Sequence, residues 1–193
     1  AKSLGAVVYS ADIRPEANEQ AKSLGARIVD TGIPAEIAVS PDGKHANKLS
    51  EEWLQKEREN LAEMVAKADI IFLSALLFGQ KAPLLITEEM VKTMKPGSTI
   101  VDISIDQGGN CEITPPGTVE TKHEIVINGI KNIPGLLPTS STWMFAHNIY
   151  NLLKYLINGD AIKLDKSDEI VNGILVCADG ELLHQGAKDA MGI

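Results

Sequence analysis

Short apolar segments alternate with amphipathic helical segments along most of this chain, and this alternation restricts the folds that it can adopt. Strands are predicted over residues 6–11, 27–29, 70–73 and 99–103. Helices are predicted over residues 15–24, 51–67 and 88–94, with Pro15 starting the first and Ser50 and Thr87 capping the other two. Strand-helix-strand alternation with fully apolar strands, such as residues 70–73, is typical of a parallel sheet buried between helices. The sequence therefore predicts an α/β doubly wound parallel sheet.

The second half of the chain leaves this pattern. Two β-like pieces near residues 118–121 and 124–128 precede a strong amphipathic helix over residues 141–156. A hairpin is predicted from residues 170–177 and 181–183, and residues 30–49 are expected to be irregular. We therefore expect a nucleotide-binding domain over residues 1–140, and a crossover helix and tail over residues 141–193 that belong to a second α/β domain.

The composition excludes several classes of protein. The 193 residues include 18 Lys and Arg against 26 Asp and Glu, and the formal net charge of −8 argues against a nucleic-acid binder. An apolar content of 44% is that of an ordinary globular protein. The longest apolar run, residues 70–78, is far shorter than the roughly 20 residues of a membrane-spanning helix. The two cysteines, Cys111 and Cys177, imply no disulfide framework, and no His or Cys pair has the spacing of a zinc site.

Asp12 follows the first predicted strand and is the first candidate for a ligand contact. In a dinucleotide-binding βαβ unit, an acidic residue at the end of the second strand binds the adenosine ribose and favours NAD over NADP. An Asp in this place also suits a simple turn, and Arg14 is suited either to a 2′-phosphate or to solvent. The first strand and the glycine-rich loop of such a unit are expected to be absent from this chain, whose residues 1–5 resemble the last turn of a helix.

Two further strand ends carry small and polar residues. Ser74, Ala75 and Leu76 follow residues 70–73, and a segment containing Asp106, two glycines and Asn110 follows residues 99–103. Ligands of doubly wound sheets bind beyond the carboxyl ends of the strands. Residues 108–109 also suit an ordinary loop, so the argument for a site rests on three strand ends at the same edge of the sheet.

Four segments resemble one family in particular, namely residues 85–91, 94–98, 100–102 and 108–112. They resemble the alanine dehydrogenase/nicotinamide nucleotide transhydrogenase family, and the resemblance extends over most of the chain. The Gly-Gly-Asn-Cys-Glu run, the tail segments 170–173 and 179–181, and Asn148–Leu153 are more similar to the transhydrogenase branch. The resemblance implies a Rossmann-like fold and the NAD(H)-binding component, of the alpha-subunit type, of proton-translocating NAD(P) transhydrogenase.

The resemblance also implies partners. Hydride would pass between NAD(H) on this component and NADP(H) on a second component, coupled to proton movement through a membrane component. The chain would be dimeric, would lie in the aqueous compartment and would be membrane-associated only through its partners. The alternatives are an alanine dehydrogenase with Asp106 as its active-site carboxylate, because residues 104–109 are similar to that branch, or a nucleotide-binding domain without a reaction of its own.

The resemblance assigns candidate cofactor-binding residues. The segment that holds adenosine would contain Asp12, Ile13 and Arg14, and the segment that lines the nucleotide would contain Ser74, Ala75 and Leu76. A loop that folds over the nucleotide would include Lys44, where the chain departs from the family pattern, and Asp106 and Asn132 would lie in cofactor-contacting loops. No dedicated acid or base is implied for the transhydrogenase reaction, because the chemistry belongs to the two nicotinamides.

Overall fold

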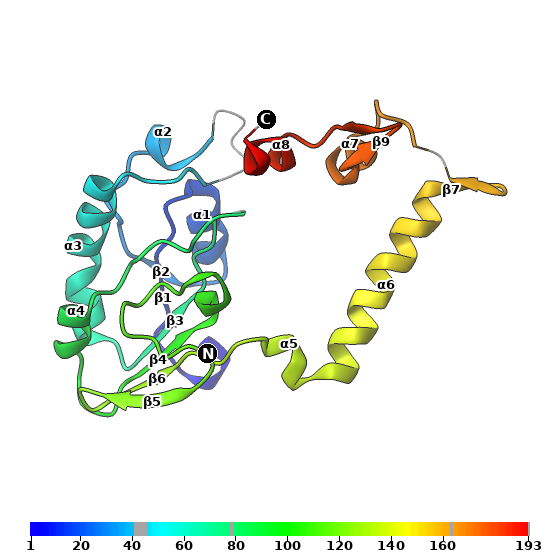
Figure 1. Ribbon diagram of the computed structural model, residues 1–193. Coiled ribbons are helices and arrows are strands. Elements are labelled where there is room, and N and C mark those ends of the chain that lie inside the picture. Colours follow the sequence, from blue (N-terminus) through cyan, green and yellow to red (C-terminus); the bar gives the residue numbers. More distant parts are fainter. Residues whose placement is uncertain (41–45, 78, 163, 193) are drawn as a thin grey trace. The chain divides into compact units, whose positions relative to one another are not determined.

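The computed structural model describes residues 1–40, 46–77, 79–162 and 164–192, and the chain divides into two compact units, residues 1–133 and 134–193 (Figure 1). The first unit contains two sheets. One is a parallel pair formed by β1 (Tyr9–Ser10) and β2 (Arg27–Ile28), and the other has the order β3-β4-β6-β5. The four strands of the larger sheet are β3 (Ile70–Leu73), β4 (Thr99–Asp102), β5 (Val119–Lys122) and β6 (Ile125–Asn128).

The larger sheet is parallel except for β5. Strands β3, β4 and β6 pair in parallel, whereas β5 pairs antiparallel with β6. The two strands are joined by His123 and Glu124, both with positive φ (52° and 63°), as a two-residue hairpin turn requires. The predicted α/β fold with parallel strands is confirmed, with an antiparallel strand added at one edge.

The helices of this unit begin where the sequence provides starting signals. They are α1 (Pro15–Ser23), α2 (Ala35–Ala38), α3 (Glu51–Lys67) and α4 (Glu88–Lys92), with the 3-10 turns η1 (Lys2–Leu4) and η2 (Ile103–Gln107). Pro15 opens α1, and the hydroxyls of Ser50 and Thr87 accept hydrogen bonds from the backbone at the starts of α3 and α4. The prediction of an irregular segment over residues 30–49 was wrong at α2, which begins after Pro34.

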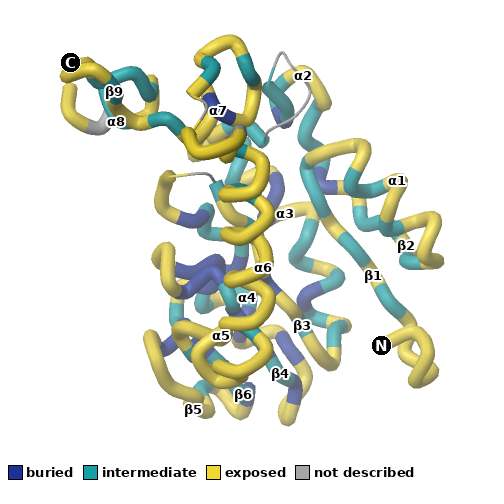
Figure 2. Tube along the Cα trace, turned by 90° about the vertical axis from the view of Figure 1, so that its right-hand side faces the viewer, coloured by how far each residue is buried: buried dark blue, intermediate teal, exposed yellow. Residues whose placement is uncertain are grey.

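The core lies between the larger sheet and the helices α3 and α4. Its buried members are Val65, Leu73, Ile86, Val91, Met94, Ile100, Cys111, Ile125 and Ile127. Burial is concentrated in the inner strands β4 and β6 (Figure 2), so these strands have the apolar environment that their sequences predict. Burial raises the pKa of the Cys111 thiol, which favours the protonated thiol over the nucleophilic thiolate.

The expectation that residues 70–73 form a fully buried strand was wrong. Ile70 and Phe72 are 73% and 62% exposed, because β3 is an edge strand of the larger sheet in this chain. In both views β1 is the next strand beyond β3 (Figures 1 and 2), but the two belong to separate sheets. Val7 and Tyr9, next to and within β1, are also exposed. In the part of the chain that the structure describes, these edges of the two sheets are therefore unpaired and carry apolar side chains.

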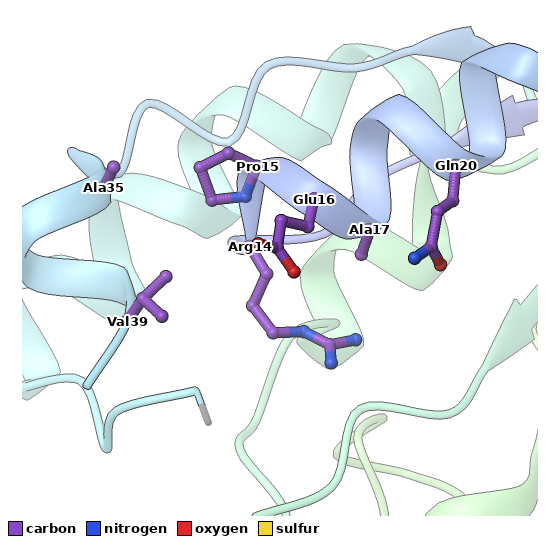
Figure 3. A pocket seen from close by; sticks show the side chains of 7 residues that line it. All are labelled: Arg14, Pro15, Glu16, Ala17, Gln20, Ala35 and Val39. Atoms are coloured by element: carbon purple, nitrogen blue, oxygen red, sulfur yellow. The ribbon is translucent and has the colours of Figure 1, made fainter. Parts of the chain in front are cut away.

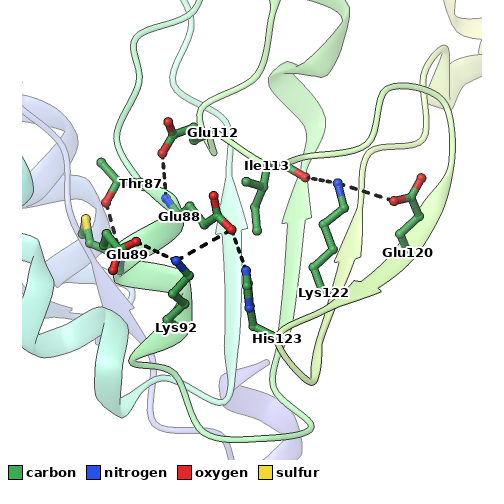
Figure 4. A network of polar contacts seen from close by, with 10 residues as sticks. Thr87, Glu88, Glu89, Lys92, Glu112, Ile113, Glu120, Lys122 and His123 are labelled. Carbon is green, nitrogen blue, oxygen red and sulfur yellow. Dashed lines mark hydrogen bonds and ion pairs between the residues drawn. The ribbon is translucent and has the colours of Figure 1, made fainter.

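The start of α4 is tied to the β5–β6 turn by a network of charged side chains (Figure 4). Glu112 accepts a hydrogen bond from the backbone N–H of Glu88 (2.8 Å), and His123 Nε2 lies 2.7 Å from Glu88 Oε1. The contact with His123 lowers the pKa of Glu88. Because His123 lies in the turn that leads into β6, the network lies at the amino edge of the parallel strands, away from the edge where ligands bind in such sheets.

The second unit is mainly helical. It contains α6 (Pro138–Leu156), β7 (Ile157–Asn158), β8 (Ala161–Ile162), α7 (Glu169–Ile174), β9 (Cys177–Ala178), β10 (Glu181–Leu182) and α8 (Gln185–Met191), and α5 (Ile133–Leu136) runs across the boundary between the units. The predicted hairpin is confirmed only at β9 and β10. Residues 170–174 are helical instead, because the Asp168 carboxylate caps α7 by accepting from the backbone of Ile170 (2.9 Å) and Val171 (3.0 Å).

Helix α6 is exposed over most of its length, and its remaining residues are only half-buried (Figure 2). It has no buried residue, and Trp143, Phe145 and Tyr150 are each more than 60% exposed. Exposed aromatic side chains grouped on one helix are typical of a surface that another part of a protein covers. None of the described helices is both long enough and apolar enough to cross a membrane.

Candidate functional site

Four parallel strands of the first unit end at one edge, where the predicted site residues follow. Figure 1 shows β1 and β3 running in the same direction, and β4 and β6 are parallel to β3. Asp12 therefore follows β1 at the same edge at which residues 74–76 follow β3 and Asp106 follows β4. This is the edge at which doubly wound sheets bind ligands.

The Asp12 carboxylate is held by Arg14. The Arg14 backbone N–H and Nε donate to Asp12 Oδ1 (2.8 and 3.1 Å), and Arg14 Nη2 donates to Oδ2 (2.8 Å). This pair raises the pKa of Arg14. The Asp12 side chain remains 28% exposed, so the carboxylate is accessible to a ligand hydroxyl. Asn18 fixes the backbone by donating to the Asp12 carbonyl (2.8 Å), and its own Oδ1 is buried without a partner among the described residues.

A pocket of about 330 Å³ lies beside Arg14, between the start of α1 and the segment around α2 (Figure 3). It is lined by Arg14, Pro15, Glu16, Ala17, Gln20, Ala35 and Val39. This volume is at the lower end of the range for small-molecule sites, roughly 300 to 1,000 Å³. The pocket thus has room for a ring system beside Arg14 rather than for a whole dinucleotide.

Glu57 places a second carboxyl group near Asp12. It lies on α3 and is only 5% exposed. Burial, and secondarily the negative charge of Asp12, raise the pKa of Glu57 to about 7, against the opposing effect of Arg58. The site consequently gains a second negative charge as the pH rises through neutrality.

The titration of Glu57 predicts a pH-dependent stability. The folded pKa lies above the ordinary value of 4.5, so the stabilisation from the bound proton is full below pH 4.5 and is lost as the pH rises through about 7. Glu57→Gln is expected to match the wild type at pH 4 and to exceed its free energy of unfolding at pH 8 by about 3 kcal/mol. Urea unfolding at the two pH values measures this difference. Glu59→Gln, on the exposed side of α3, serves as the control, and parallel pH profiles of wild type and Glu57→Gln would contradict the prediction.

Asp102 organises the loop that follows β4. It is the last residue of the strand and is 1% exposed. Its Oδ2 accepts hydrogen bonds from the backbone N–H of Asn110 (2.8 Å) and Cys111 (3.1 Å) and from the hydroxyl of Thr114 (3.0 Å), and its Oδ1 accepts from the backbone of Ser104 (3.1 Å). One buried carboxylate thus accepts the hydrogen bonds that these four donors would otherwise make to water, and it fixes the conformation of the loop.

Gly109 is the point of closest approach to this carboxylate. Its φ is 82°, and a Cβ there would lie 2.8 Å from Asp102 Oδ2 and 3.2 Å from Ile105 Cδ1. Gly117 has a similar φ of 89° but no neighbouring atom within 4 Å. Both Gly→Ala changes are expected to cost about 1 kcal/mol for the left-handed backbone, and Gly109→Ala roughly 2 kcal/mol more for overpacking. Equal unfolding midpoints for the two variants in urea would refute the close packing at Gly109.

The loops after β4 and β6 are joined by Asp106. Its Oδ2 accepts a hydrogen bond from the backbone N–H of Asn132 (3.1 Å), and Asn132 has a left-handed φ of 50°. The structure therefore brings these two predicted site residues together. A Cβ on Gly108 would lie 2.9 Å from Lys81 Cε, so the Lys81 stem covers Gly108 and brings a cation to this edge. The predicted lid residue Lys44 lies outside the described residues.

The sequence analysis did not identify Glu57 and Asp102 as part of this region, although the sequence pattern around each of them indicates a buried polar group. Glu57 lies three residues after Leu54 and four before Leu61, so it interrupts the apolar stripe of its helix. Asp102 ends a strand that is otherwise apolar. Such carboxyl groups within buried patterns indicate a polar network rather than a solvated surface. Within the described part of the chain, no group of three or more His, Cys, Asp or Glu residues is placed to hold a metal ion.

The chain matches the family described as alanine dehydrogenase/PNT, C-terminal domain, over residues 1–185. It belongs to this family. The resemblance predicted from the motifs is thereby confirmed. The structure is similar to the crystal structure of transhydrogenase from Sinorhizobium meliloti, with a TM-score of 0.72 and 34% identity over 94% of this chain and 46% of that one.

Two curated members of the family differ in how much of the chain they match. The NAD(P) transhydrogenase subunit alpha of Haemophilus influenzae is 41% identical over 184 residues, which cover 94% of this chain and 36% of that protein. The alanine dehydrogenase of Bacillus subtilis is 36% identical over 138 residues, which cover 69% of this chain and 36% of that protein. The transhydrogenase alpha subunit is thus the more extensive match, and the matched region is little more than a third of the length of either relative.

Proposed function

We propose that this chain is part of the NAD(H)-binding component of a proton-translocating NAD(P) transhydrogenase. The observation that carries the proposal is the accessible carboxylate of Asp12 at the end of β1, in a chain matched over nearly its whole length by a transhydrogenase alpha subunit. An acidic residue in this place binds ribose hydroxyls and disfavours a 2′-phosphate. The pocket beside Arg14 is suitable for the adjacent adenine.

The residues at the carboxyl edge of the strands would hold NAD(H). Asp12, Ile13 and Arg14 would bind adenosine, residues 74–76 would line the nucleotide, and Lys44, Asp106 and Asn132 would contribute from the surrounding loops. When bound, NADH supplies a hydride for NADP⁺, which yields NAD⁺ and NADPH without net consumption of a proton. The protein need only orient the nicotinamide and exclude water, so no residue is proposed as an acid or base.

We further propose that the complete protein supplies a strand between β1 and β3. No described strand pairs with these two edges, and Ile70 and Phe72 expose apolar side chains that a neighbouring strand and its helix would cover. A glycine-rich loop after that strand would reach the phosphates. Residues 1–140 would then belong to one nucleotide-binding domain, and residues 141–193 would cross to a second α/β domain.

The partners of the proposed enzyme are an NADP(H)-binding component and a membrane component. This chain would lie in the aqueous compartment and would be membrane-associated through those partners. A second copy of the protein is proposed to cover the exposed aromatic side of α6, which would give a homodimer.

Hydride exchange distinguishes this function from its rivals. The full-length protein, mixed with an NADP(H)-binding component, is expected to transfer hydride between NADH and NADP⁺ and to leave NAD⁺ unchanged in the presence of L-alanine. Asp106 favours the second candidate, an alanine dehydrogenase, because it offers a carboxylate at the strand-end edge. Turnover of L-alanine without a partner would establish that candidate and refute the transhydrogenase. NADH binding with neither activity would leave a nucleotide-binding domain without its own reaction.

A further inference from the structure

The side chain of Asn110 is completely buried, and its hydrogen bonds to described residues all go to the backbone of Ala75 and Pro83. Its Oδ1 accepts from the Ala75 N–H (3.0 Å), and its Nδ2 donates to the carbonyl oxygens of Ala75 (2.9 Å) and Pro83 (2.8 Å). Both polar groups of the Ala75 backbone are thereby satisfied by one amide. All the polar atoms of this side chain have partners, which makes it a fixed part of the structure.

The Asn110 amide continues the sheet beyond its last backbone pair. The β3–β4 ladder ends at the pair of Leu73 and Asp102. Two residues later, the planar donor and acceptor of Asn110 take the place of a backbone peptide opposite Ala75. Because a side-chain amide has the same donor and acceptor groups as a peptide, it can hold a strand end straight where the partner strand has turned away into η2.

Asn110 is itself held in place from both sides. Its N–H donates to the buried Asp102 carboxylate (2.8 Å), and its carbonyl accepts from the N–H groups of Leu85 (2.8 Å) and Ile86 (3.0 Å). The hydroxyl of Ser104 adds a second hydrogen bond to the Ala75 carbonyl (3.2 Å). The position of Ala75 is thus determined by a rigid chain of contacts that begins at the end of β4.

We propose that Asn110 is a positioning residue for the nucleotide: it fixes Ala75 so that the flanking residues Ser74 and Leu76, which are exposed, meet the ligand in one conformation. The inference rests on the proposed function, in which residues 74–76 line NAD(H). A segment fixed before the ligand arrives loses no further conformational entropy on binding, so this contact strengthens affinity without touching the ligand.

The test is the dissociation constant for NADH in the full-length protein, followed by the fluorescence of the reduced nicotinamide. Asn110→Ala is expected to weaken binding about tenfold, because the Ala75 N–H loses its partner, the Ala75 carbonyl keeps only the Ser104 hydroxyl, and the segment must be ordered by the ligand. Ser98→Ala is the matched control. Ser98 is buried and joins the same two strands at their amino edge through the Ala68 carbonyl (3.2 Å), far from the proposed site.

Asn110→Asp provides a pH-dependent signature, measured over the pH range in which circular dichroism shows the variant to be folded. An ionised carboxylate cannot donate to the Ala75 and Pro83 carbonyls, whereas a protonated carboxyl regains one donor. The ratio of the variant's dissociation constant to that of the wild type is therefore expected to fall as the pH is lowered from 8 to 6. If Asn110→Ala does not fold, this pH-dependent ratio decides the question, and a ratio that stays constant with pH overturns the proposal.

The outcomes separate this inference from the proposed function. If the wild type binds NADH and Asn110→Ala binds it with the same affinity, only the positioning role of Asn110 is contradicted. Equal weakening in Ser98→Ala and Asn110→Ala shows a general loss of stability and likewise overturns the inference. A wild-type protein that does not bind NADH contradicts the proposed function, and the positioning role with it.

Discussion

Asp12→Asn is expected to weaken the binding of NADH to the full-length protein by at least about 100-fold, because two ribose hydroxyls lose hydrogen bonds to a charged acceptor. The substitution keeps the shape of the side chain and removes only its charge and one acceptor oxygen. In the wild type, the Arg14 guanidinium donates to both oxygens of the Asp12 carboxylate. The substitution also removes the charge that pairs with this guanidinium. A freed cation beside the ribose site should attract a 2′-phosphate, so discrimination between NADH and NADPH is expected to fall in the same variant.

Titration of nucleotide fluorescence with both cofactors measures these two effects. Asp69→Asn is the control, because Asp69 precedes β3 at the opposite edge of the sheet, is largely exposed and pairs only with Lys95 (2.9 Å) among the described residues. Its affinity for NADH should equal that of the wild type. If Asp12→Asn binds NADH as tightly as the wild type, the prediction that the Asp12 carboxylate binds the ribose is wrong.

Asp102→Ala is expected to lower the free energy of unfolding by about 4 kcal/mol, because four buried donors lose their common acceptor. Asn110, Cys111, Thr114 and Ser104 would each retain a polar group in the core without a compensating contact. Asp102→Asn is expected to lower the free energy of unfolding by less than Asp102→Ala does. Its remaining oxygen still accepts hydrogen bonds, but its NH₂ group faces donors with which it cannot bond.

Urea unfolding of the full-length protein checks this prediction, again with Asp69→Asn as the control. The exposed Asp69–Lys95 pair is expected to contribute less than about 1 kcal/mol. Similar losses for Asp102→Ala and Asp69→Asn would mean that the loop after β4 is not held by the buried carboxylate.

The elements that the sequence predicted correctly are those with local chemical signals. Helix α3 begins and ends where the Ser50 cap and the apolar stripe place it, and β4 and β6 follow their apolar runs. The hairpin over residues 170–177 failed for an equally local reason. Asp168 can accept two backbone hydrogen bonds, and this cap converts an apolar segment without clear periodicity into α7.

Contacts between segments that are distant in the sequence could not be predicted from the sequence. The exposure of β3 depends on which strand lies beside it, and no property of residues 70–73 specifies that neighbour. The contact of Asn110 with Ala75 joins residues 35 positions apart and needs the folded sheet to exist. The predicted strands placed Asp12 and Asp106 after strand ends, and both residues follow strands in the structure; their part in binding stays a prediction. The sequence did not indicate the Asp12–Arg14 pair or the Asp106–Asn132 hydrogen bond.

A crystal structure of the full-length protein with bound NADH tests the central proposal most directly. The proposed function predicts that both hydroxyls of the adenosine ribose lie within hydrogen-bonding distance of the Asp12 carboxylate, with residues 74–76 against the nucleotide. Adenosine bound away from the end of β1, with Asp12 still paired only to Arg14, would contradict it.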